Sequence, residues 1–224
     1  PGRRGAPCFA GDTVYAWSGV WERAERPGRS DVGALRPRLV QAGVLAAWAG
    51  GAALGLGLPA MITGGLAALA CALNAVRLSG WRGGRTLHDP LLWVLHLGFL
   101  FMVLAQGALA VQMVAGQGDD LAVVHLAGIG AIGIMTLAMM SRASLGHTGR
   151  ALKAPPPVAL AYGLVALAAV LRALGPLLAP AHAPGEILLS GFMWLAGFSL
   201  FLWRYLPILA GPEAPRPPLH PVNN

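Results

Sequence analysis

Three ionisable side chains interrupt long apolar runs of the sequence: His96, His125 and Arg172. Ionisable groups are costly to bury in a bilayer, so those that occur there are functional candidates by default. Neutral imidazole is a ligand for copper, zinc and haem iron. Arginine can hold an anionic group such as a haem propionate, or extend to the membrane interface, which is the more common case. For each histidine, a hydrogen bond to a neighbouring helix is an equally good explanation.

Two further histidines border these runs. His88 precedes the run that contains His96, and His147 lies in a polar segment that we expect to be a loop. Together with His96 they are candidates for a metal or haem site at one face of the membrane. The alternative for His88 and His147 is an ordinary loop histidine, while His182 and His220 lie in Pro-rich stretches and are uninformative.

The run that contains His125 is also unusually poor in side-chain bulk. Small residues in membrane helices let backbones approach closely, so helix packing is the simpler explanation of this pattern. The alternative explanation is a flat surface against which a macrocycle could lie. Met135 and Met139 share one face of the same run, and Met140 follows. Thioethers ligate copper or haem iron, although methionine in an apolar helix more often packs. The small residues are Ala127, Gly128, Gly130, Ala131 and Gly133.

The composition requires a membrane environment for these side chains. Hydrophobic residues make up 56% of the 224 residues and charged ones 11%, with a mean hydropathy of +0.62, whereas soluble domains carry about 25% charged residues. A soluble enzyme, a disordered regulator and a coiled coil are excluded. The net charge of +7 is spread in short clusters between uncharged runs, which leaves no basic surface for nucleic acid. Cys8 and Cys71 provide neither a disulfide framework nor a CxxC site.

We therefore predict an all-α polytopic transmembrane bundle. A membrane span needs about 20 apolar residues, and six segments meet this requirement. Pro- and Gly-rich turns separate most of them, and the tight turn at Pro59 makes the first pair the least certain. The six predicted spans are residues 39–58, 60–78, 91–115, 121–140, 158–179 and 187–209.

The charges of the connecting segments predict the orientation. Arginine and lysine occur in one set of loops. In the other set the charged residues are all acidic: Asp119, Asp120 and Glu186. Positive loops stay in the cytoplasm, which predicts that both termini are cytoplasmic. His96 is then roughly 7–8 Å inside one face and His125 roughly 6 Å inside the other, so the two lie on the order of 15 Å apart along the membrane normal. They are not expected to share an ion, and no row of titratable residues supports ion-coupled transport.

Three parts of the chain differ in composition. Residues 1–36 are polar and rich in proline and glycine, and we interpret them as a cytoplasmic tail that is disordered or non-native. Residues 37–212 form the predicted six-helix membrane domain. Residues 213–224 are a Pro-rich C-terminal tail.

Four motifs of this domain resemble the NnrS family. They are residues 89–98 (DPLLWVLHLG), 125–140 (HLAGIGAIGIMTLAMM), 142–150 (RASLGHTGR) and 201–209 (FLWRYLPIL). The resemblance runs from about Arg38 to Pro212, and residues 1–36 match nothing in the family's pattern. Because members of the family are longer, the chain resembles their C-terminal half.

The resemblance implies a multi-pass protein of the bacterial inner membrane that carries haem and copper and serves the response to nitric oxide and nitrosative stress. The family's histidine positions fall on His96, His125 and His147, which become candidate ligands. Nitric oxide or an iron–nitrosyl species is the implied ligand, and the missing N-terminal half or a second copy is the implied partner. Catalysis stays open. The alternatives are a transport or scaffold subunit without a redox centre, and an inactive fragment.

Overall fold

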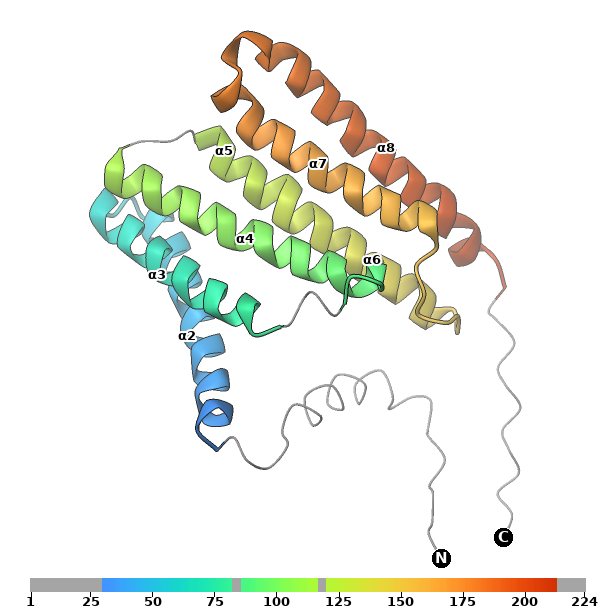
Figure 1. Cartoon of the computed structure of the whole chain (residues 1–224), viewed down its shortest axis with the longest axis horizontal. Coiled ribbons are helices and arrows are strands. Elements are labelled where there is room, and N and C mark those ends of the chain that lie inside the picture. Colours follow the sequence, from blue (N-terminus) through green and yellow to red (C-terminus); the bar gives the residue numbers. More distant parts are fainter. Residues whose placement is uncertain (1–29, 82–85, 117–119, 213–224) are drawn as a thin grey trace, which may run out of the picture.

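The described part of the chain is built from helices alone, as predicted. The computed structural model describes residues 30–81, 86–116 and 120–212, and of residues 30–37 the backbone only. The elements, labelled in Figure 1, are α2 (Ser30–Gly55), α3 (Ala60–Ser79), α4 (Pro90–Ala115), α5 (Asp120–His125), the π-helix η2 (Leu126–Gly133), α6 (Ile134–His147), α7 (Pro156–Leu178), the 3-10 turn η3 (Pro180–His182) and α8 (Ala183–Ala210).

Local sequence signals fix the ends of α4, the helix that carries His96. The Asp89 side chain caps its N-terminus and accepts a hydrogen bond of 3.0 Å from the Leu91 amide. Pro90 occupies the first helical position, where a missing amide proton costs nothing. Gly116 ends the helix at φ 60°, a left-handed conformation that glycine adopts without strain. The register of α4 is therefore set locally.

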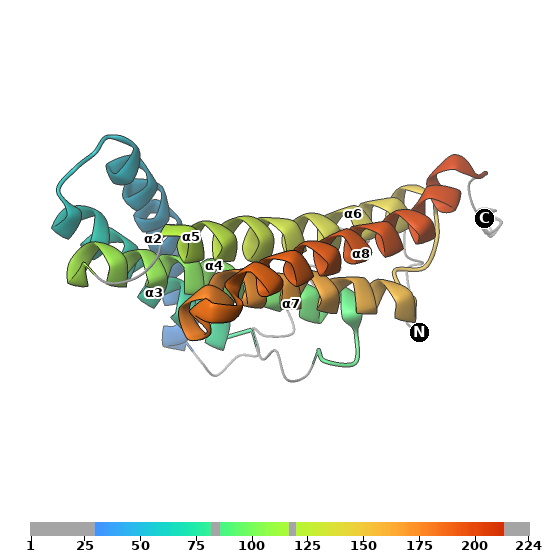
Figure 2. The same ribbon diagram turned by 90° about the horizontal axis from the view of Figure 1, so that it is seen from above.

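Four long helical segments lie side by side: α4, the continuous segment α5–η2–α6, α7 and α8 (Figures 1 and 2). α3 packs against α4, and α2 packs against α3 while crossing the other helices at a steep angle. The core lies among α4, α6, α7 and α8. Its largest side chains are at most 2% exposed, and they include Leu91, Ile134, Tyr162, Phe201 and Tyr205.

The outer surface of these helices is apolar, as expected of a protein surrounded by lipid. Large hydrophobic side chains are well exposed on several helices, among them Val124, Ile132, Leu188 and Trp203, each at least 60% exposed. Five described segments are long and apolar enough to cross a membrane, namely residues 60–79, 90–115, 120–147, 156–178 and 180–210. The chain is thus a multi-pass membrane protein.

The first of the six predicted spans is helical but is not among these five segments. It corresponds to α2, which begins at Ser30, nine residues before the expected start at Leu39. The first turns of α2 carry Asp31, Arg36 and Arg38. A sixth crossing and the cytoplasmic placement of both termini stay predictions.

The fourth span differs from its prediction in two ways. It continues to His147, beyond residue 140, so His147 ends helix α6 and does not lie in a loop as we expected. Its middle, Leu126–Gly133, is a π-helix. The wider turn of a π-helix is rare, and it frequently marks a functional site. Here it follows His125 directly and contains all three glycines noted in the sequence.

Candidate functional site

His96 has one ring nitrogen occupied and one free. Its Nδ1 lies 2.9 Å from the carbonyl oxygen of Leu92, one turn earlier on α4. Because a carbonyl only accepts, Nδ1 carries the proton and donates it. The Nε2 atom is then an unprotonated acceptor, and it is buried without any hydrogen-bond partner. An imidazole held by an Nδ1–H donor to a backbone carbonyl, with Nε2 free, is the usual state of a metal-ligating histidine.

Trp81, just after the end of α3, contacts His96 and belongs to an aromatic cluster with Phe99 of α4. The Trp81 ring meets the imidazole edge to face, at 5.3 Å between centroids, and also contacts Phe99 at 4.7 Å. The Arg77 guanidinium carbon lies 5.3 Å from the Trp81 ring centroid and 5.0 Å from that of Phe99. These distances are within cation–π range. His96 therefore contacts an aromatic ring that is itself in contact with a cation, a setting that the sequence did not indicate.

His125 is engaged differently. The Nε of Arg172, on α7, donates a hydrogen bond of 3.1 Å to its Nε2. An acceptor Nε2 means that the ring is neutral and that Nδ1 carries the proton, and Nδ1 is buried without a partner. Metal coordination through Nδ1 would require the proton to be on Nε2. The N–H of Nε2 would then face the N–H of Arg172, and the hydrogen bond between them would be lost. The pair thus fits the hydrogen-bonded explanation that the sequence left open.

The two histidines are far apart along the bundle. α4 and the fourth span run antiparallel, with Gly98 against Met135 and Phe101 against Gly130. Five residues before Gly130, His125 is level with Gln106, which is ten residues along α4 from His96. That is roughly 15 Å at 1.5 Å per residue, in agreement with the depths predicted from the sequence. One ion cannot bind both.

The remaining candidate ligands do not gather around His96. His88 and His147 are both exposed. Within the described ranges, no three His, Cys, Asp or Glu side chains lie close enough to hold one metal ion. The convergence of His88, His96 and His147, which the sequence left open, is therefore not formed. Of the methionines in the fourth span, Met135 packs on Gly98, and Met139 and Met140 face outward at 60% and 41% exposure.

An apolar groove lies between α4 and the π-helical segment. It encloses about 410 Å³, and Met102, Ala127, Ala131 and Met135 are among the residues that line it. Helix packing explains Gly98 and Gly130, because a Cβ at Gly130 would lie 2.6 Å from Phe101 Cγ. Gly128 instead faces open space. Phe99 links the groove to the aromatic cluster, although neither His96 nor His125 lines the groove.

Comparisons with known proteins agree with the motifs. The family model described as NnrS protein matches residues 9–213. This match extends well into residues 1–36, for which we expected no family resemblance. Beta-methylmalyl-CoA dehydratase of Chloroflexus aurantiacus is 56% identical over 39 residues, which are 17% of this chain and 11% of that protein. So short a stretch carries no argument about activity. No solved structure matches the chain. Because the family model covers nearly all of it, the chain belongs to the NnrS family.

Proposed function

We propose that this protein binds haem through His96 and serves the bacterial response to nitric oxide, in the inner membrane and with both termini in the cytoplasm. The observation that carries the proposal is the free, buried Nε2 of His96. A buried polar atom without a partner is rare in a folded protein and requires an explanation. An iron ligand is the explanation that also accounts for the Nδ1–H bond to Leu92.

Single, widely spaced histidines suit haem better than copper. The porphyrin supplies four of the iron's ligands, so one protein nitrogen is enough to anchor it. A copper ion takes most of its ligands from the protein, and the described residues offer no such group. We therefore expect copper only where further ligands come from the N-terminal half of a longer protein or from a second copy of this chain. His147 would then contribute as one exposed ligand among several, and His88 less favourably.

The residues around His96 would serve the cofactor in distinct ways. A bound haem iron supplies a coordination position for a diatomic ligand such as nitric oxide. Trp81 would shield the imidazole that it contacts from water, and the Arg77 guanidinium beside Trp81 would supply positive charge for a carboxylate. Arg172 remains a candidate for a propionate only after it leaves His125.

A second function is favoured by the His125–Arg172 hydrogen bond. A histidine whose Nε2 accepts a hydrogen bond from a neighbouring helix can be a structural group, as in a transport or scaffold subunit without a redox centre. Both functions predict a folded membrane protein. They differ in whether the chain retains iron.

The test is a reduced-minus-oxidised visible spectrum of the detergent-purified chain, with iron and copper measured on the same sample. His96→Gly should remove the haem band, and added imidazole should restore it by occupying the vacated space. His125→Ala, which removes an imidazole from the same bundle, is the matched control and should leave the band in place. Nitric oxide added to the reduced protein should shift the Soret band.

Two results would contradict the proposal. A haem band that persists in His96→Gly would remove this residue as a ligand, and loss of the band in His125→Ala alone would move the site to the other end of the bundle. Absence of iron from the unaltered protein, after expression with sufficient haem, would favour the scaffold function.

A further inference from the structure

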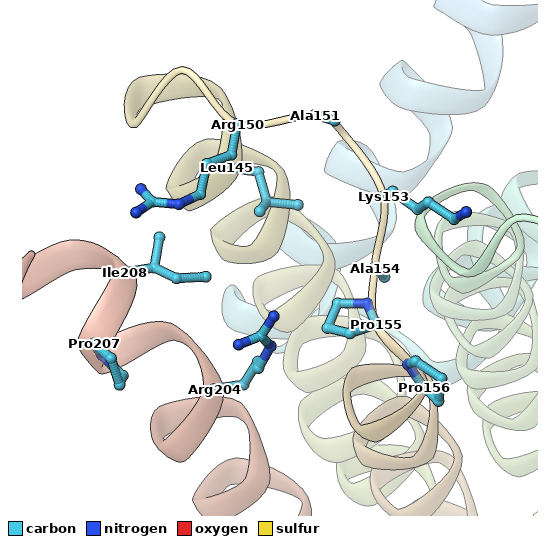
Figure 3. A pocket seen from close by; sticks show the side chains of 10 residues that line it. All are labelled: Leu145, Arg150, Ala151, Lys153, Ala154, Pro155, Pro156, Arg204, Pro207 and Ile208. Atoms are coloured by element: carbon cyan, nitrogen blue, oxygen red, sulfur yellow. The ribbon is translucent and has the colours of Figure 1, made fainter. Parts of the chain in front are cut away.

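A second cavity lies at the end of the bundle where α6 is followed by α7. It encloses about 650 Å³ (Figure 3). The end of α6 and the connection to α7 form one wall, and the last turns of α8 form the other. Leu145, Ala154, Pro155 and Ile208 make much of its lining apolar. None of the residues that line this cavity has a role in the function proposed above.

Three cations border the cavity: Arg150, Lys153 and Arg204. None of them forms an ion pair within the described part of the chain. Nη2 of Arg150 makes one long hydrogen bond of 3.4 Å to the Pro212 carbonyl oxygen, and its Nη1 is buried with no partner. A desolvated guanidinium nitrogen without an acceptor is costly, and an anion would offset that cost.

The three cations are oriented differently. In Figure 3 the side chains of Arg150 and Arg204 come from opposite walls, and Ile208 lies between them in this view. Lys153 points away from both. Two guanidinium groups from two elements are suited to the oxygens of a phosphate, which accept several hydrogen bonds at once. Lys153 contributes only to the general positive potential.

The apolar lining and the location specify the rest of the ligand. The cavity opens at the ends of membrane-spanning helices, the level at which lipid headgroups lie. Basic pockets between such helices bind anionic headgroups. A free phosphate would use the arginines but not the exposed apolar rings of Pro156 and Pro207, whereas a phospholipid would use both.

We propose that this cavity binds the phosphate group of an anionic phospholipid, with Arg150 and Arg204 as its direct contacts. Free inorganic phosphate has the same oxygen chemistry and is the alternative source. The two sources differ in whether an attached acyl chain strengthens binding.

The experiment uses the full chain in detergent, with native mass spectrometry to count bound lipid. Phosphatidylglycerol is titrated against phosphatidylcholine with the same acyl chains, and inorganic phosphate is added as a competitor. Arg150→Gln and Arg204→Gln should each weaken phosphatidylglycerol binding about tenfold or more, because each loses a charge-assisted hydrogen bond. Lys153→Gln removes the same charge from the same loop, and it should change binding by less than about twofold because it makes no direct contact.

Three outcomes would overturn the proposal. Equal weakening by all three substitutions, about fivefold each, would indicate a general surface potential without a site. Equal binding of the two lipids would exclude recognition of the anionic headgroup. Saturation by inorganic phosphate at the concentration that phosphatidylglycerol requires would make the cavity a free-phosphate site. If Arg150→Gln does not fold, Arg204→Gln and Arg150→Lys answer the same question, since lysine keeps the charge but not the paired donors.

Discussion

Substitution of Gly130 tests the packing of the π-helical segment against α4. An added Cβ at Gly130 would lie 2.6 Å from Cγ and 2.9 Å from Cβ of Phe101, far inside normal contact. Phe101 is only 3% exposed, and its Cβ cannot swing away from the backbone. Gly130→Ala therefore has to push the two helices apart. Overpacking of this kind costs about 1–3 kcal/mol.

Gly128 supplies the matched control. It lies in the same π-helix, two residues away, and an added Cβ there meets nothing within 4 Å. Alanine is preferred to glycine in helices by about 1 kcal/mol, and this gain is common to both substitutions, so it cancels when they are compared. Gly128→Ala should be more stable than Gly130→Ala by about 1–3 kcal/mol, or about 2–12 °C in Tm for a chain of this size.

Thermal unfolding of the detergent-purified chain, followed by helical circular dichroism, measures this difference. Phe101→Ala combined with Gly130→Ala should destabilise less than the sum of the two single changes, because the smaller side chain removes the clash. Equal Tm values for Gly128→Ala and Gly130→Ala would refute the close approach of α4 and η2.

Two further predictions concern the ends and the polar contacts of the helices. Asp89→Ala removes the acceptor for the Leu91 amide and should cost about 0.5–2 kcal/mol in thermal unfolding; Asp89→Asn should retain most of the stability, and an unchanged Tm in Asp89→Ala would contradict the cap. His125→Ala and Arg172→Ala should show a coupling of about 0.5–3 kcal/mol in a double-mutant cycle, because the second substitution has no hydrogen bond left to break; strictly additive effects would argue against the bond.

The sequence predicted most of the helical architecture because apolar length is a strong signal in a membrane protein. Residues 91–115 and 158–179 agree with α4 and α7 within a few residues. The sequence placed the end of the fourth span too early, at residue 140, because the helix continues past the apolar run to His147. Ser144 and His147 are polar, yet both are helical, since Ser144 is buried and its carbonyl accepts a 2.7 Å hydrogen bond from the Thr148 hydroxyl.

The π-helix could not be predicted, because its small residues are equally compatible with an α-helix packed against α4. The common depth of His125 and Arg172 in the membrane could have been predicted, but their contact could not. Each lies about a turn and a half from the end of its helix, and those ends belong to the same side of the membrane in the predicted topology. We considered them separately, as a ligand and as an interfacial cation, because nothing in the sequence shows which faces of the helices meet.

The two half-buried histidines both lie in apolar runs of the sequence, and their hydrogen bonds distinguish them. The bond from His96 to Leu92 is internal to α4 and persists however the helices assemble, whereas the bond from Arg172 to His125 depends on α7 staying in place. A ligand that binds His96 through Nε2 breaks no hydrogen bond of the protein. A ligand that binds His125 through Nε2 has to displace Arg172 and leave a half-buried cation without its acceptor, which is costly unless the ligand itself carries an anionic group. Arg172→Ala should therefore ease access of a neutral ligand to His125. The same substitution should weaken retention of a haem at His125 whose propionate contacts Arg172. A haem held by His96 should be unaffected.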